Sequence, residues 1–244
     1  MLTIRFDDSL AISSMKAIRA GDVATLERLL VENPELAATK IKDRKGGCRS
    51  LLHIAADWPG HFPNGGAIVY CLLKTSADVE GGVQGQGDTP LHWAASSDDV
   101  EVAEVLVAGG ADLNAPNGSI GTPLENAVGY GQWQIARFLV DRGAKVDKLW
   151  VAAALGMASR VAQFLAQSPP PTKDEINDAF WQACHGGQIR TAKMLLEHGA
   201  DINFNPFHND STPLDVAANC DSRREALVDW LKENGAQSKE AVRV

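Results

Sequence analysis

Apolar residues recur along the chain in short runs with helical spacing. The segments VEVAEVLV at 100–107, QIARFLVD at 134–141 and RTAKMLLE at 190–197 place apolar residues three and four positions apart. That spacing gathers them on one face of an amphipathic helix. Each run is followed by glycine, which is favoured in the left-handed position that ends a helix. The pattern predicts a series of short helices.

A short motif precedes these helices and predicts a partner helix for each. TPLHWAA begins at Thr89 and recurs as TPLENAV at Thr122 and TPLDVAA at Thr212, with a looser copy, SLLHIAA, at Ser50. The threonine hydroxyl can cap the first free N–H groups of a helix, and proline suits the first helical position. The Ala pair is small enough to let neighbouring helices approach closely. The first two full copies are 122 − 89 = 33 residues apart.

A period near 33 residues with a TPLHxA opening is the signature of ankyrin repeats, and the chain resembles that family over roughly residues 11–236. The resemblance implies an all-α solenoid of stacked helix-turn-helix units with projecting hairpins or loops and a concave face. We expect a single domain over residues 1–236, capped at both ends, and a C-terminal tail at 237–244. The expected units, about seven, begin near Ile12, Ser50, Thr89, Thr122, Asp147, Asp178 and Thr212.

Two steps in the array depart from the period. The second unit carries an insertion, DWPGHFPNGG at 57–66, which we expect to project where its paired helices reverse. The link GAKVDKLW at 143–150 has no room for a hairpin, because Thr122 and Asp147 are only 147 − 122 = 25 residues apart. A missing hairpin at this link would open a notch in the concave face.

Aromatic residues supply the first candidates for a binding surface. Trp150 and Trp181 occupy the position where other units carry histidine. The resemblance implies that this position hydrogen-bonds the backbone of adjacent loops, and we favour a packing role for both tryptophans. For the other aromatic candidates, packing and ligand contact are about equally expected. These are Trp58, Trp93, Tyr130 and Trp133.

Polar candidates gather where the first helix of the third unit ends. Ser96 and Ser97 occupy variable positions that the resemblance associates with ligand contact, and Asp98 stands where most units have glycine. Asp99 can cap the second helix, but that role accounts for only one of the two acids. His185 is the only histidine that we consider for a site, and a plain turn role is favoured even there. The full candidate set is Trp58, Trp93, Ser96, Ser97, Asp98, Asp99, Tyr130, Trp133, Trp150, Trp181 and His185.

Charge and composition restrict the classes of partner. The formal net charge of 23 − 31 = −8 argues against binding to a nucleic-acid backbone. The one basic group is interpreted as a solvated loop: Lys40, Lys42, Arg44, Lys45 and Arg49. No apolar run is long and uncharged enough for a membrane span, and the N-terminus lacks the pattern of a signal peptide. We expect a cytoplasmic protein whose four cysteines are reduced.

The sequence favours binding over catalysis. It contains no GxSxG, HExxH or P-loop motif, and it suggests no metal or cofactor. Cys184 beside His185 is interpreted as a core thiol rather than a nucleophile. The leading hypothesis is a monomeric protein-protein interaction module that binds its partner on the concave face, with Asp98 and Asp99 favouring a basic partner. The alternative is a small-molecule-binding protein or enzyme whose pocket is lined by aromatic residues, Asp98, Asp99 and His185. A third possibility is that the irregular repeats reflect drift without any demand for binding.

Overall fold

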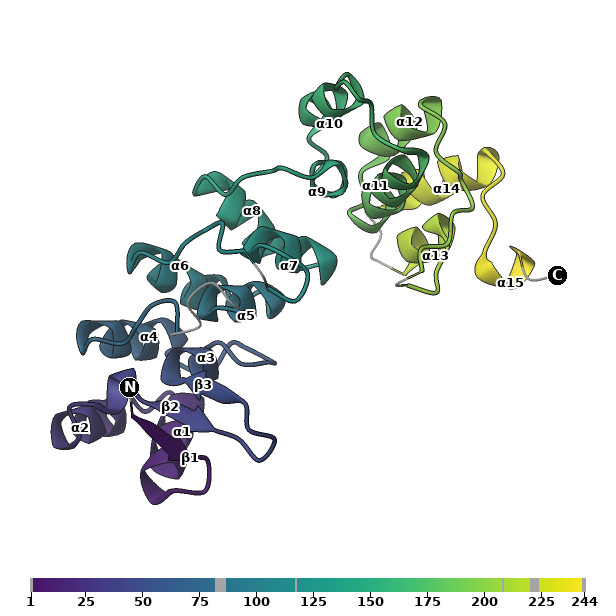
Figure 1. Cartoon of the computed structure of the whole chain (residues 1–244). Coiled ribbons are helices and arrows are strands. Elements are labelled where there is room, and N and C mark those ends of the chain that lie inside the picture. Colours follow the sequence, from purple (N-terminus) through teal and green to yellow (C-terminus); the bar gives the residue numbers. More distant parts are fainter. Residues whose placement is uncertain (1, 82–86, 117, 208, 220–223, 243–244) are drawn as a thin grey trace. The chain divides into compact units, whose positions relative to one another are not determined.

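A computed structural model of the chain consists mainly of short helices that pair along the sequence (Figure 1). The structure describes residues 2–81, 87–116, 118–207, 209–219 and 224–242. In these ranges the strands are β1 (Thr3–Arg5), β2 (Lys40–Lys42) and β3 (Cys48–Ser50). The helices are α1 (Ser9–Ala20), α2 (Val23–Glu32), the 3₁₀ turn η1 (Leu36–Ala38), α3 (Leu51–Ala55), α4 (Gly65–Lys74), α5 (Pro90–Ser96), α6 (Val100–Ala108), α7 (Pro123–Gly129), α8 (Trp133–Asp141), α9 (Leu149–Ala154), α10 (Ala158–Leu165), α11 (Lys173–His185), α12 (Ile189–Glu197), α13 (Pro213–Ala218), α14 (Glu225–Glu233) and α15 (Lys239–Val242).

The chain divides into two compact units, residues 1–145 and 146–244. In the first unit the inner helices α1, α3, α5 and α7 pack in order, and the outer helices α2, α4, α6 and α8 do the same. In the second unit the inner helices α9, α11 and α13 pack in order, and α10 packs against α12. Each inner helix also packs against the outer helix that follows it, for example α5 against α6 and α7 against α8, which confirms the predicted series of paired helices. A single continuous domain over residues 1–236 stays a prediction.

The TPL motif begins helices in the way the sequence predicts. The hydroxyls of Thr89, Thr122 and Thr212 each accept the backbone N–H of the third helical residue, and that residue's side chain accepts the threonine N–H in return. Proline occupies the start of all three helices, where its missing N–H is not needed. Ser50 makes the same reciprocal cap at α3. Each cap stabilises its helix by about 1 kcal/mol.

The sixth inner helix begins earlier than the sequence alignment placed it. Helix α11 starts at Lys173, five residues before Asp178 (178 − 173 = 5), and Thr172 caps it together with Glu175. The segment TKDE carries the same cap chemistry as the TPL motif but lacks the proline. The cap therefore could have been found from the threonine and the glutamate three residues later.

A small sheet at the N-terminus was not expected from the sequence. Strand β1 pairs in parallel with β2, and β2 pairs antiparallel with β3. The basic group therefore lies on a hairpin rather than on an irregular loop. Asp43 closes the hairpin turn by accepting the N–H groups of Lys45 and Gly47 at 2.8 and 2.9 Å.

The link between α8 and α9 is too short to form a hairpin, as its length in the sequence predicted. Helix α8 ends at Asp141 and α9 begins at Leu149, and the structure, which describes every residue in between, has no strand there. The division between the two units falls within this link. The notch expected beside it stays a prediction.

Candidate functional site

A pocket of about 250 Å³ lies beside the 57–66 loop in the first unit. Its lining brings together four of the candidates from the sequence, namely Trp58, Trp93, Ser96 and Ser97. The Trp58 side chain is 79% exposed, whereas Trp93 is half-buried on the inner helix α5. A large, exposed indole next to a pocket offers apolar area and a ring N–H that a partner can contact.

The 57–66 loop is fastened to the repeats on both sides. His61 N–H donates to Asp99 Oδ2 at 2.7 Å, and Gly66 N–H donates to Glu101 Oε1 at 3.0 Å. On the other side, Asn64 Nδ2 donates to the Gly21 carbonyl at 2.9 Å. Trp58 is therefore presented by a loop that is already ordered, which reduces the entropy lost when a partner binds.

Trp93 is held between a histidine and an arginine. Its ring meets His53 edge to face, with ring centroids 5.1 Å apart and an interplanar angle of 77°. The Arg49 guanidinium lies 4.9 Å from the centre of the same ring, close enough for a cation–π interaction. These contacts position the indole at the edge of the pocket.

Asp98 and Asp99 both bond the backbone near the start of an outer helix. Asp99 is buried and accepts the Val102 N–H of its own helix α6 at 3.1 Å. Asp98 has a φ of +55°, a value that aspartate tolerates better than most residues, and its carboxylate accepts the Ile135 N–H at 2.9 Å. Ile135 lies in the first turn of α8, whose own N-cap residue, Gln132, makes no side-chain cap bond. Both acids therefore stabilise the array, and the expectation of a basic partner stays a prediction.

Ser96 and Ser97 differ in how far their side chains are exposed to a ligand in the pocket. The Ser96 hydroxyl donates to the His92 carbonyl at 2.9 Å, and Ser97 is buried. Gly60 packs so closely that a side chain there would approach the Cβ of Ser97 to 2.8 Å. The serines thus shape the wall of the pocket and support the 57–66 loop.

Trp181 makes the hydrogen bond that histidine makes in other repeats. Nε2 of His53 and of His92 lies 2.9 Å from the carbonyl before the next threonine cap, that of Asp88 or Gly121. Trp181 is buried, and its Nε1–H donates to the equivalent Ser211 carbonyl at 2.8 Å. Its burial and this hydrogen bond fit the packing role that the sequence favoured, and a binding role for Trp181 stays a prediction.

The geometry around His53 and His92 fits a neutral imidazole in each. Nδ1 of His53 accepts the Ser50 N–H at 3.3 Å, and Nδ1 of His92 accepts the Thr89 N–H at 3.0 Å. The ring proton is thus on Nε2, which donates to the carbonyl of the next loop. Burial lowers the pKa of both imidazoles.

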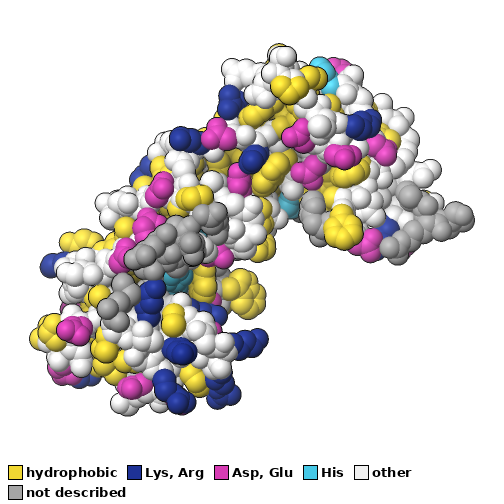
Figure 2. All heavy atoms as spheres, in the orientation of Figure 1, with side chains coloured by type: hydrophobic (Ala, Val, Ile, Leu, Met, Phe, Trp, Pro, Cys, Tyr) yellow, Lys and Arg dark blue, Asp and Glu magenta, His cyan; other side chains and the backbone are white. Residues whose placement is uncertain are grey.

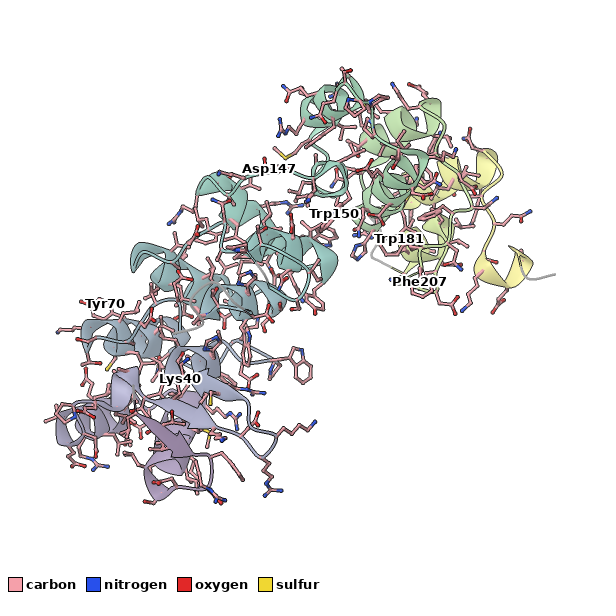
Figure 3. All side chains as sticks on the ribbon, viewed as in Figure 1. Lys40, Tyr70, Asp147, Trp150, Trp181 and Phe207 are labelled. Carbon is pink, nitrogen blue, oxygen red and sulfur yellow. The ribbon has the colours of Figure 1, made fainter. Side chains whose placement is uncertain are left out.

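The remaining candidates do not line the pocket. Tyr130 is 52% exposed at the end of α7, and Trp133 is half-buried at the start of α8. Trp150 is partly buried against the core of the second unit, which is the packing role that the sequence favoured. Figure 3 labels Trp150 and Trp181 on their helices.

His185 belongs to the second unit, whereas Asp98 and Asp99 belong to the first. Its Nδ1 lies 3.3 Å from Gln182 Oε1, and its ring centroid lies 5.3 Å from that of Trp181. Burial, helped by the charge of Arg224, lowers the pKa of His185 to about 4. Burial raises the pKa of the neighbouring Cys184 thiol, so the two do not form a thiolate–imidazolium pair.

A second pocket of about 500 Å³ opens beside the β2–β3 hairpin, also in the first unit. The sequence interpretation missed it, because its apolar lining comes from segments far apart in the chain, such as Phe6, Met15 and Ile54. Four cationic residues also line it, namely Arg19, Arg44, Lys45 and Arg49. Figure 2 shows Lys and Arg side chains gathered over the part of the chain that holds the strands.

A match to a known protein family shows the family of this chain. The family model for ankyrin repeats in three copies matches residues 14–117, 53–148 and 149–241, which together cover most of the sequence. The chain belongs to the ankyrin-repeat family. The resemblance inferred from the TPL motif is thereby confirmed.

Known ankyrin-repeat proteins that match the chain are mostly much longer. The ankyrin repeat and KH domain-containing protein mask-1 of Caenorhabditis elegans is 26% identical over 176 residues, 69% of this chain but 6% of the relative. A putative ankyrin repeat protein of Rickettsia felis is 42% identical over 117 residues, 48% of this chain and 45% of the relative. The matched part of the chain thus spans less than half of either relative.

The solved structure of the human ASB11 ankyrin repeat domain has the same fold. It covers 88% of this chain, and 96% of its own length is matched, with a TM-score of 0.51 and 21% sequence identity. That similarity confirms the predicted ankyrin solenoid and carries no information about ligands.

The alternative of a small-molecule site gains no support from this ankyrin-repeat structure. The pocket beside the 57–66 loop, about 250 Å³ in volume, falls below the range of about 300–1,000 Å³ that is usual for such sites. The pocket of about 500 Å³ beside the hairpin lies within that range, but none of the candidate residues from the sequence lines it. Within the described ranges, no group of three or more His, Cys, Asp or Glu side chains could hold a metal ion. No described helix is both long and apolar enough to cross a membrane.

Proposed function

We propose that the chain is a protein-binding module whose partner contacts inner helices of the first unit and is anchored by Trp58. The observation that carries this proposal is the position of Trp58: it is 79% exposed, yet it sits on a loop fastened at both sides next to a pocket. Tryptophan is one of the residue types that are enriched among the energetic hot spots of protein interfaces.

Family membership supports the same class of function. Ankyrin repeats are general protein-protein interaction modules. Trp93 lines the same pocket as Trp58 and adds a second indole that the partner contacts. Tyr130 is a further exposed aromatic residue in the first unit. A partner on the concave face, a cytoplasmic location and a monomeric chain are further parts of this proposal.

Partner capture with matched aromatic variants tests the proposal. Trp58→Ala removes the anchor, whereas Tyr70→Ala removes a ring that is 62% exposed on the outer helix α4 (Figure 3). We expect Trp58→Ala to weaken binding of the captured partner at least about tenfold, because a hot-spot tryptophan contributes about 2 kcal/mol or more. Tyr70→Ala is expected to leave binding within about twofold.

Both variants should unfold at the same urea concentration as the parent chain, since each truncates an exposed side chain. Equal weakening of binding by Trp58→Ala and Tyr70→Ala would show that the partner does not use the pocket. Unchanged binding by Trp58→Ala would contradict the proposed anchor directly.

A further inference from the structure

The pocket beside the β2–β3 hairpin has a charge opposite to that of the whole chain. The formal net charge of the sequence is −8, yet cationic side chains outnumber carboxylates in this pocket. The charged lining residues are Arg19, Arg44, Lys45, Arg49, Asp43 and Asp57. An acidic protein thus presents local positive charge at one hollow, and charge complementarity of this kind selects partners and speeds their association.

The two carboxylates already have partners within the chain. Asp43 accepts the backbone N–H groups of the hairpin turn, as described above. Asp57 lies between two arginines, 3.5 Å from Arg19 and 3.7 Å from Arg49. In the described part of the chain, no ion pair involves Arg44 or Lys45. The positive charge of these two side chains is therefore available to a ligand.

Aromatic rings hold the arginines in place. The Arg44 guanidinium lies 5.0 Å from the centre of the Phe6 ring, and that of Arg49 lies 4.9 Å from the centre of the Trp93 ring. A guanidinium stacked on a ring keeps its edge N–H donors free to bind a carboxylate. Because the stacking restricts the side chain beforehand, less rotamer entropy is lost when a ligand binds.

This pocket adjoins two other hollows, with which it shares lining residues. It shares Met15 and Arg19 with a hollow along α1, which also includes Ile12, and it shares Asp57 with the pocket at Trp58. We call these three adjoining hollows, whose lining comes from residues in or next to α1, α3 and α5, the groove. Along it, apolar side chains accompany the cationic ones, and this combination suits a polypeptide better than a small anion.

We propose that this groove binds an extended, acidic segment of the protein partner. Aspartate or glutamate side chains of the segment pair with Arg44 and Lys45, and an apolar side chain enters the pocket beside Trp58. The inference rests on the proposed function, since it names the chemistry of the partner that Trp58 anchors. A nucleic acid fits less well, because Asp57 lies within the groove and the chain as a whole repels phosphates.

Selection from a library of random short peptides tests the inference without knowledge of the partner. The full-length chain is the bait, and the double variant Arg44→Glu/Lys45→Glu is the counter-bait. We expect enriched peptides to carry several acidic residues and at least one aromatic or aliphatic residue. Enrichment of basic or neutral peptides, or no enrichment at all, would overturn the inference.

A matched charge reversal separates the groove from the general electrostatics of the chain. The double variant Lys74→Glu/Arg137→Glu changes the net charge by the same amount as Arg44→Glu/Lys45→Glu, but its substitutions lie on the outer helices α4 and α8. We expect Arg44→Glu/Lys45→Glu to weaken a selected peptide, labelled with a fluorophore, at least about tenfold, and the outer-helix pair to weaken it less than about threefold. Equal weakening would overturn the inference.

The two proposals fail in distinguishable ways. Loss of partner binding in Trp58→Ala, together with full binding in Arg44→Glu/Lys45→Glu, would retain the protein-binding function and reject the acidic segment. Binding of single-stranded RNA that depends on Arg44 and Lys45, with no acidic peptide selected, would replace the acidic segment with a nucleic acid.

Discussion

Asp98 and Trp181 each replace a residue that recurs in other repeats, and each shows how a side chain can be exchanged while the architecture is kept. Asp98 stands where other repeats have glycine, adopts the same positive φ and also bonds the start of the next outer helix. Trp181 stands where His53 and His92 occur, and its indole N–H reaches the same kind of loop carbonyl. At the scale of single residues, these departures from the repeat serve the stacking of one repeat on the next.

Replacement of Asp98 should therefore affect stability and not binding. We expect Asp98→Ala to lower the free energy of unfolding by about 1–2 kcal/mol, because the Ile135 N–H loses its acceptor and alanine disfavours a positive φ. Urea unfolding measures the loss, and partner binding below the transition should match that of the parent chain. Loss of partner binding with no change in the unfolding midpoint would contradict this prediction and show that Asp98 contacts the partner.

At the scale of elements, the cap of each inner helix could be predicted from a few neighbouring residues. The TPL motif located α5, α7 and α13, because threonine, proline and the third helical residue act locally. The early start of α11 was missed because its cap lacks the proline. Strand β1 was missed because three residues carry too little pattern, and its pairing with β2 depends on a segment far along the chain.

His53 in the cap of α3 and His92 in the cap of α5 should make the stability of the fold depend on pH. Burial lowers the pKa of His53 and His92 in the folded chain, so the unfolded chain binds protons first as the pH falls. Stability is then fully present above about pH 6.5 and decreases as the pH falls below it. Urea midpoints should decline from about pH 7.5 to about pH 5, and less steeply in His92→Gln. Identical pH profiles for the parent chain and His92→Gln would contradict this assignment.

The candidate site illustrates where prediction from sequence stops. The sequence brought forward Trp58, Trp93, Ser96 and Ser97, which do line one pocket, because repeat alignment indicates which positions share a surface. It assigned Asp98 and Asp99 to the same surface, because alignment does not show which N–H groups a carboxylate reaches. The basic groove was missed because its apolar floor and its cations come together only when β1, α1 and the hairpin are folded.

At the scale of the whole molecule, the two compact units differ in what they offer. The first unit carries the fastened loop, the exposed Trp58 and the cationic groove, whereas the second buries Trp181 and Cys184 in its core. The binding proposals therefore rest entirely on residues 1–145. Related ankyrin repeats occur in longer proteins, among them mask-1.

Hydrogen exchange of the full chain, with and without the captured partner, tests the central claim most directly. The account predicts slower amide exchange on binding at residues 57–66, at the hairpin turn 43–47 and along α1, α3 and α5, with no comparable change in α11 to α13. Protection confined to residues 146–244, with exchange at the 57–66 loop unchanged, would contradict it.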